Sequence, residues 1–154
     1  MPADSEGAGV SLPVTWRPLG GPIVGVVLGV GLLVVFGAAW FAFDDETRGK
    51  FTAFQIGTML VLGALGFACL HALIRSRVVA SRDGLLIVNG YRKHQLAYEQ
   101  VVDVHLSPGA PWVTLDLSDG TTLSVLGIQG SDGRRAVRAA RALRALVVNP
   151  PSVD

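Results

Sequence analysis

The chain has 154 residues, half of them hydrophobic, and a mean hydropathy of +0.47, which is more apolar than an ordinary soluble domain. Its net charge of only +1 argues against a bulk nucleic-acid binder, because such domains are strongly basic. The single cysteine, Cys69, excludes an intrachain disulfide, and its apolar surroundings indicate a buried hydrophobe and not a reactive thiol.

Residues 1–20 mix Pro, Ala, Asp, Ser, Glu and Gly without an apolar period, which predicts a flexible tail. Two uncharged runs follow, at about 22–43 and 51–74, separated by a short connector. Each run has the roughly 20 apolar positions that a helix needs to cross a membrane. The first run is too long for the apolar region of a signal peptide. We therefore predict a two-helix transmembrane hairpin over residues 21–75.

Small residues recur at four-residue spacing in both runs, on one face of each expected helix. In a bilayer such faces let two backbones approach closely. We interpret them as the contact within the hairpin, with a dimer seam as the alternative. The residues are Gly21, Gly25, Gly29, Ala64, Ala68 and Ala72.

Lys and Arg residues close to the spans predict the orientation, because cytoplasmic flanks carry an excess of them. The connector has Arg48 and Lys50, whereas more basic residues lie on the terminal side: Arg17, Arg75, Arg77, Arg82, Arg92 and Lys93. We predict a multi-pass protein of the cell (inner or plasma) membrane with both termini in the cytoplasm. His71 lies near the cytoplasmic end of the second run, so we interpret it as reaching the headgroups and not as part of a proton path.

After the second run the pattern changes to short β-branched and aliphatic segments. Asp83-Gly84 separates the first two, Asn89-Gly90 turns the chain into a third, and Ser107-Pro108-Gly109 ends another at residues 101–106. We predict strands for all of them.

Residues 112–117 and 121–125 alternate apolar and polar side chains, as in strands with one buried face. A two-residue loop between them would put the apolar faces out of step. A three-residue loop, with Gly120 in the left-handed region as a bulge, sets Leu115 opposite Leu123. We predict the second register.

Ser131 or Asp132 is expected to cap a final helix that runs to about Val148, and its apolar face is expected to pack on the sheet. The opposite surface is either a solvated face or a surface that binds anionic lipid or a partner. It carries Arg134, Arg135, Arg138, Arg141 and Arg144.

Short motifs recur in order through this second half: Asp83, Gly84, Leu85, Leu96, Tyr98, Val101, Asp119 and Gly120. On these positions, residues 77–148 resemble the bacterial pleckstrin-homology-like (PH domain-containing) small membrane proteins, including the low-molecular-weight antigen group of high-GC bacteria. Tyr98 stands where the family pattern usually has Trp. The resemblance implies an α+β PH-like domain, in which a bent antiparallel sheet of about six strands is capped by the C-terminal helix. The full pleckstrin-homology fold has seven strands. Residues 149–154 are expected to form a tail.

Catalysis has little support in the sequence, which has no Gly-rich phosphate loop, no nucleophile-elbow pattern and no HExxH. Asp103 and His105 share a strand face and could join His94 in a metal or acid–base set. No nucleophile, base and orienting group can be named among them. We interpret them as residues of a solvated strand, and we predict no catalytic, cofactor or metal site.

We therefore expect a non-enzymatic, membrane-anchored binding or scaffolding module that presents a cytoplasmic surface to protein or anionic lipid. Its expected partners are the membrane lipid bilayer and a protein or a second copy of the chain, without nucleic acid. The alternative is a small accessory or assembly subunit of a larger envelope, transport or secretion complex, acting through its membrane helices. Eukaryotic relatives often bind phosphoinositides through basic residues of the first hairpin loop, but only Arg82 lies beside that turn, so no headgroup specificity is implied.

Overall fold

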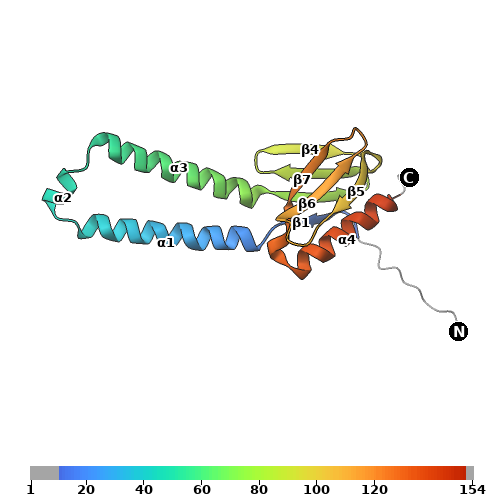
Figure 1. Cartoon of the computed structure of the whole chain (residues 1–154), viewed down its shortest axis with the longest axis horizontal. Helices are drawn as coiled ribbons and strands as arrows, with labels where there is room; N and C mark the ends of the chain where they lie inside the picture. The colour runs from blue at the N-terminus through green and yellow to red at the C-terminus, as the bar shows by residue number, and fades with distance from the viewer. Residues whose placement is uncertain (1–10, 152–154) are drawn as a thin grey trace.

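The computed structural model describes residues 11–151. Two long helices, α1 (Gly20–Ala42) and α3 (Ala53–Arg75), run side by side as a hairpin, and the short helix α2 (Asp45–Gly49) closes its far end (Figure 1). The Asp44 carboxylate accepts a hydrogen bond from the Thr47 N–H and caps α2. A capping box of Thr52 and Gln55 begins α3.

Neither long helix has a buried residue, although both consist mainly of apolar side chains. Phe41 and Phe54, near the closed end of the hairpin, are 82% and 83% exposed. Contiguous apolar surface of this extent is rare on soluble monomers. Both helices, at 23 residues each, are long and apolar enough to cross a membrane.

The sheet domain lies at the open end of the hairpin (Figure 1) and has two antiparallel sheets. The predicted single sheet of about six strands is therefore wrong. The four-stranded sheet has the order β1 (Val14–Trp16), β2 (Arg77–Ser81), β3 (Gly84–Asn89) and β4 (Arg92–Leu96). The three-stranded sheet has the order β5 (Val101–His105), β6 (Trp112–Leu117) and β7 (Thr122–Gln129). Helix α4 (Arg134–Val148) follows.

The additional strand, β1, comes from the segment before the hairpin. It pairs with β2, and Trp16 lies opposite Val78. This part of the chain thus differs from the tail predicted for residues 1–20, of which 1–10 lie outside the described residues, as do 152–154 of the predicted C-terminal tail. The hairpin is an insertion between the first two strands, and both of its ends join one sheet.

The two sheets and α4 enclose one core, in which Ile87, Leu115, Ile128 and Leu143 are at most 2% exposed. Asn89 connects the sheets, because its side-chain amide donates to the Ser124 carbonyl and accepts from the Leu126 N–H. Such a bridge gives hydrogen-bond partners to backbone groups that would otherwise be buried without one.

The β6–β7 hairpin confirms the predicted register. Leu115 lies opposite Leu123, and Val113 lies opposite Val125. Gly120 has φ +82°, so the bulge residue adopts the left-handed backbone that favours glycine. The Leu117 N–H donates to the Thr121 carbonyl at 2.9 Å and closes the loop.

Candidate functional site at the helix–sheet junction

Strand direction decides which loops of the sheet domain lie near the hairpin. Only Ser76 separates α3 from β2, so β2 leads away from the hairpin and the turn at Arg82 and Asp83 lies at the far end (Figure 1). Strand β3 returns, and the β3–β4 turn at Gly90 and Tyr91 lies against α3. We call this hairpin-side end of the domain the junction.

Gly90 lets the β3–β4 turn approach α3 closely. Its φ is +61°, and a Cβ added there would lie 3.0 Å from the Ala72 Cβ. The Gly90 N–H donates to the Ser76 Oγ at 3.0 Å, and the Ser76 hydroxyl donates to the Ala72 carbonyl at 3.1 Å. Because Ser76 is fully buried, these bonds hold the turn against the last turn of α3.

Tyr91 extends from this turn back along α3. Its hydroxyl donates to the Ala68 carbonyl at 3.3 Å and lies 2.9 Å from the His71 Nδ1. Since the phenol has one proton, this arrangement requires His71 to donate from Nδ1. The Arg75 guanidinium lies 5.7 Å from the centre of the Tyr91 ring, within cation–π range.

The other helix of the hairpin is held by Asp132. Its carboxylate accepts hydrogen bonds from the Leu19 and Gly20 N–H groups at 3.1 and 2.7 Å. The prediction that Ser131 or Asp132 caps the final helix is therefore wrong, since Gly133 is the N-cap of α4 and no side chain caps it. A carboxylate at the N-terminus of α1 accepts hydrogen bonds from amides that have no partner within the helix, and its negative charge interacts favourably with the helix dipole.

The glycines predicted to line the hairpin contact lie near α3. A Cβ on Gly25 would be 2.6 Å from the Leu70 Cδ1, and one on Gly29 would be 4.0 Å from the Leu70 Cδ2. A Cβ on Gly21 would meet the Gln129 side chain at 2.6 Å and Leu73 at 3.4 Å. These glycines therefore meet leucines of α3.

The alanines of the same prediction lie elsewhere on α3. Ala72 contacts Gly90, and the carbonyl of Ala68 accepts from Tyr91. Both therefore meet the β3–β4 turn. Ala64, farther along α3, is exposed.

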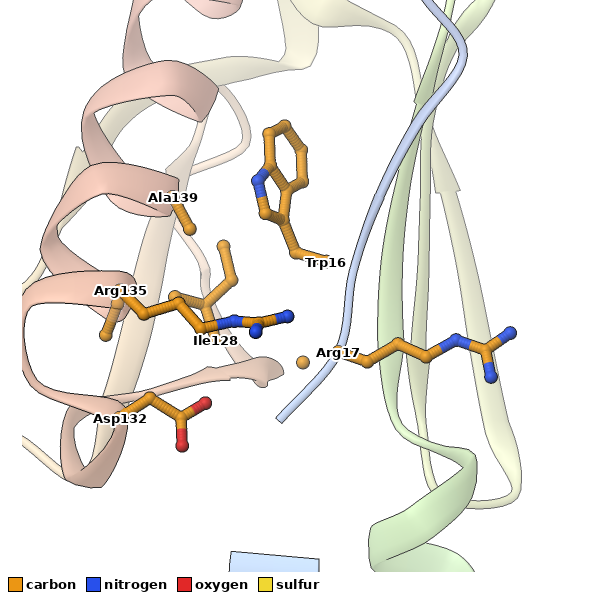
Figure 2. A pocket seen from close by; sticks show the side chains of 8 residues that line it. Trp16, Arg17, Ile128, Asp132, Arg135 and Ala139 are labelled. Carbon is orange, nitrogen blue, oxygen red and sulfur yellow. The ribbon is translucent and has the colours of Figure 1, made fainter. Parts of the chain in front are cut away.

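A shallow notch lies beside β1 and α4 (Figure 2). Trp16 stands between the two elements, Arg135 points across the notch toward β1, and Arg17 points away from it. The notch has about 180 Å³ of empty space, a volume that includes open solvent. The notch is therefore a dent in the surface and does not enclose a ligand.

Basic side chains gather at the junction. Arg17 precedes α1, Arg75 ends α3, and the others begin β2, β4 and α4. We call the set the basic collar: Arg17, Arg75, Arg77, Arg92, Lys93, Arg134 and Arg135. Among the described residues, no acid forms an ion pair with any of them. The other acids described on the sheet domain, apart from Asp132, are Asp83, Glu99, Asp103, Asp116 and Asp119.

All five arginines predicted as a binding surface on the final helix are exposed. Helix α4 begins beside the start of α1 and runs away from the hairpin (Figure 1). Arg134 and Arg135 thus lie in the basic collar, while Arg138 and Arg141 lie farther along. Arg144, near the far end, donates to the Asp103 carboxylate at 2.7 Å.

The polar residues weighed for catalysis separate into two groups. His105 Nε2 lies 2.7 Å from an Asp116 carboxylate oxygen and 3.5 Å from an Asp103 oxygen. His94 is on β4, in the other sheet. A hydrogen bond from the Val104 N–H, and then one from Arg144, lowers the pKa of Asp103. Within residues 11–151, no set of three His, Cys, Asp or Glu side chains is placed to hold a metal.

The motif positions that carry the family resemblance support the fold. Leu85, Tyr98 and Val101 are buried in the core. Gly84 has φ +137°, and a side chain there would collide with the Leu96 carbonyl. Asp83 is exposed in its turn, and the Asp119 carboxylate accepts from the Thr121 side-chain hydroxyl and backbone N–H, which lower its pKa.

Tyr91 and Asp132 are junction residues whose roles sequence reasoning missed. The position of Tyr91 could have been found, because a strand that leaves the hairpin and one that returns bring Asn89-Gly90 back to α3. Asp132 carries no such signal, since an Asp before a helical run is the ordinary pattern of a local cap.

Comparison with known proteins gives a family-model match to the second half of the chain. The family model for the bacterial PH domain matches residues 75–146, from the end of α3 into α4. No curated protein and no solved structure matches the chain. The matched segment contains β2 to β7, and β1, which lies before the hairpin, supplies the seventh strand. The match supports a PH-like domain in the second half of the chain.

Proposed function

We propose that the protein is a membrane-anchored, non-catalytic PH-like module that binds or scaffolds a partner in the cytoplasm. The observation that carries this proposal is the attachment of the PH-like domain to the open end of an exposed apolar hairpin. PH-like domains typically bind proteins or lipids. A module of this kind works by placing a binding surface at a fixed height above the bilayer.

Strand pairing supports the placement of both termini on one side. Because β1 precedes α1 and β2 follows α3, and because the two strands pair, a hairpin that spans the bilayer would have both of its ends on the same face. The basic collar supports the cytoplasm as that side. At the closed end of the hairpin, Arg48 forms an ion pair with Asp45, and Lys50 forms one with Glu46.

The test is cysteine accessibility in sealed membrane vesicles. Single cysteines at Ser11, Gly49 and Asp119, in a Cys69→Ala background, report the three parts of the chain. We expect the cysteines at positions 11 and 119 to react with a membrane-impermeant thiol reagent from the cytoplasmic side, and the cysteine at position 49 to react from the opposite side. Labelling of Ser11 and Asp119 from opposite sides, or release of the protein by carbonate, would overturn the proposal.

A second candidate function is assembly through the membrane helices within a larger complex. It is favoured by Gly63 and Gly66, which lie three residues apart on one face of α3, since a Cβ on either would meet nothing within 4 Å. Small residues on such a face allow close packing of another helix. Affinity capture of the full chain tests it, because Gly63→Leu should then lose a partner that Arg138→Glu retains.

A further inference from the structure

We infer that the basic collar binds the headgroups of anionic lipids in the adjacent leaflet, with Arg75, Arg92 and Lys93 around Tyr91 as its centre. The inference rests on the membrane anchoring proposed above, and it adds a ligand and a site. The site differs from the β2–β3 turn, where Arg82 lies at the far end of the domain.

The length of α3 places Tyr91 at the boundary of the bilayer. Its 23 residues span about 35 Å at 1.5 Å per residue, slightly more than the roughly 30 Å of hydrocarbon. The turn that carries Tyr91 lies against Ala72, about one helical turn before the helix end at Arg75, and the Tyr91 hydroxyl extends from there to the Ala68 carbonyl. A tyrosine at this level is typical of the membrane interface. Arg92 and Lys93 follow it at once and therefore lie at headgroup height.

Contacts with α3 hold these cations at that height. Gly90 lies against Ala72, its N–H is bonded to Ser76, and Tyr91 is bonded to His71 and Ala68. The turn cannot move away from α3 without breaking these bonds. A site positioned in advance loses less conformational entropy when a ligand binds.

The charge distribution identifies the ligand as anionic. The basic collar has seven cations, and the only acid described beside it is Asp132, whose carboxylate is occupied by the amides of α1. Farther from the hairpin, by contrast, Arg144 is paired with Asp103. Lipid phosphates at the leaflet surface supply the missing negative charge, and long basic side chains extend readily to them.

The experiment uses the full chain in lipid vesicles with a trace of spin-labelled phosphatidylglycerol or spin-labelled phosphatidylcholine. Electron paramagnetic resonance measures the fraction of each lipid immobilised by the protein. We expect the wild type to prefer phosphatidylglycerol, and Arg92→Gln/Lys93→Gln to lower that preference by about threefold or more, since each cation near the surface contributes strongly at low salt.

The matched control is Arg138→Gln/Arg141→Gln, which removes the same charge from exposed residues farther along α4. It should leave the preference unchanged, as should the charge-conserving pair Arg92→Lys/Lys93→Arg. An equal loss in the α4 control would overturn the inference, because it would assign the effect to net charge. Inorganic phosphate, compared with chloride at equal ionic strength, should not displace the lipid; displacement would indicate a free-phosphate site instead.

The outcomes separate this inference from the proposed function. Flotation of the vesicles in a density gradient reports whether the protein is anchored. A wild type that floats with the vesicles but shows no preference for phosphatidylglycerol contradicts the lipid site and agrees with the proposed anchoring. A wild type that does not float with the vesicles contradicts both. Should Arg92→Gln/Lys93→Gln unfold, as circular dichroism would show, Arg75→Gln provides the second test, with the same expected fall in preference.

Discussion

Tyr98 and Tyr91 show two different uses of one side chain. Tyr98 is 4% exposed, and its hydroxyl donates to the Ser81 carbonyl at 2.7 Å at the far end of the domain. Burial raises the pKa of this phenol. Tyr91 is 61% exposed and bonds to α3 at the junction. The buried tyrosine therefore contributes to the fold, and the exposed one positions a turn.

Replacing Tyr98 by phenylalanine removes a buried hydrogen bond and leaves the Ser81 carbonyl without its partner. We expect Tyr98→Phe to lower the free energy of unfolding by about 1–2 kcal/mol. Thermal unfolding of the full chain in detergent measures the change. The control is Tyr91→Phe, which we expect to have a smaller effect on the sheet domain; equal effects would contradict the distinction.

The hydrogen bonds that Asp103 accepts, from the Val104 N–H and then from Arg144, predict a pH dependence. Because the pKa of Asp103 is lowered from its ordinary value of 3.8, its contribution to stability is present above that value and is lost as the pH falls through the folded-state pKa. The wild type should therefore unfold at a slightly higher temperature than Asp103→Asn near neutral pH. The difference should shrink near pH 3, and a constant difference would contradict the assignment.

At the scale of elements, the capping of α1 by Asp132 couples the hairpin to the sheet domain. Asp132→Ala should free the amides of Leu19 and Gly20, since loss of an N-cap costs about 0.5–2 kcal/mol. Hydrogen exchange at these two amides should become faster. Asp119→Ala, which removes an acid at the far end of the domain, should leave their exchange unchanged.

The contact between α1 and α3 depends on small size at Gly25. We expect Gly25→Leu to separate the helices at their open end, because even a Cβ there would lie 2.6 Å from the Leu70 side chain. Gly31→Leu is the control, since a Cβ at Gly31 meets nothing within 4 Å. Distances between spin labels on α1 and α3, in a Cys69→Ala background, report the separation; equal changes in both variants would contradict it.

Elements specified by neighbouring residues were predictable from the sequence. Two long apolar runs were sufficient to predict α1 and α3. Alternating apolar and polar residues, with a glycine in the connecting loop, were sufficient to predict the β6–β7 register. The β1 strand was not, because Val14–Trp16 is too short to show a period and its partner follows the whole hairpin. The role of Asp132 was hidden for the same reason, since its partners are more than one hundred residues away.

At the scale of the whole molecule, the four-stranded sheet is complete only with β1, which lies before the hairpin. A polypeptide that begins at Arg77 lacks β1 and exposes the edge of β2, which invites aggregation. Joining residues 11–17 to Arg77 through a short Gly-Ser linker should restore the edge, because Trp16 and Val78 are antiparallel neighbours. Thermal unfolding and size-exclusion chromatography compare the two polypeptides. Equal stability would show that β1 contributes little.

Because the hairpin is inserted between β1 and β2, these two paired strands are translated at different times. Val14–Trp16 leaves the ribosome first, yet its neighbour Arg77–Ser81 is translated only after both apolar helices. Pairs so distant in the chain form late, because a long loop must close before they gain any contact. With the membrane anchoring proposed above, a nascent chain whose second helix failed to re-cross the bilayer would leave the two strands in different compartments. Closure of the sheet would then require that both helices had inserted correctly.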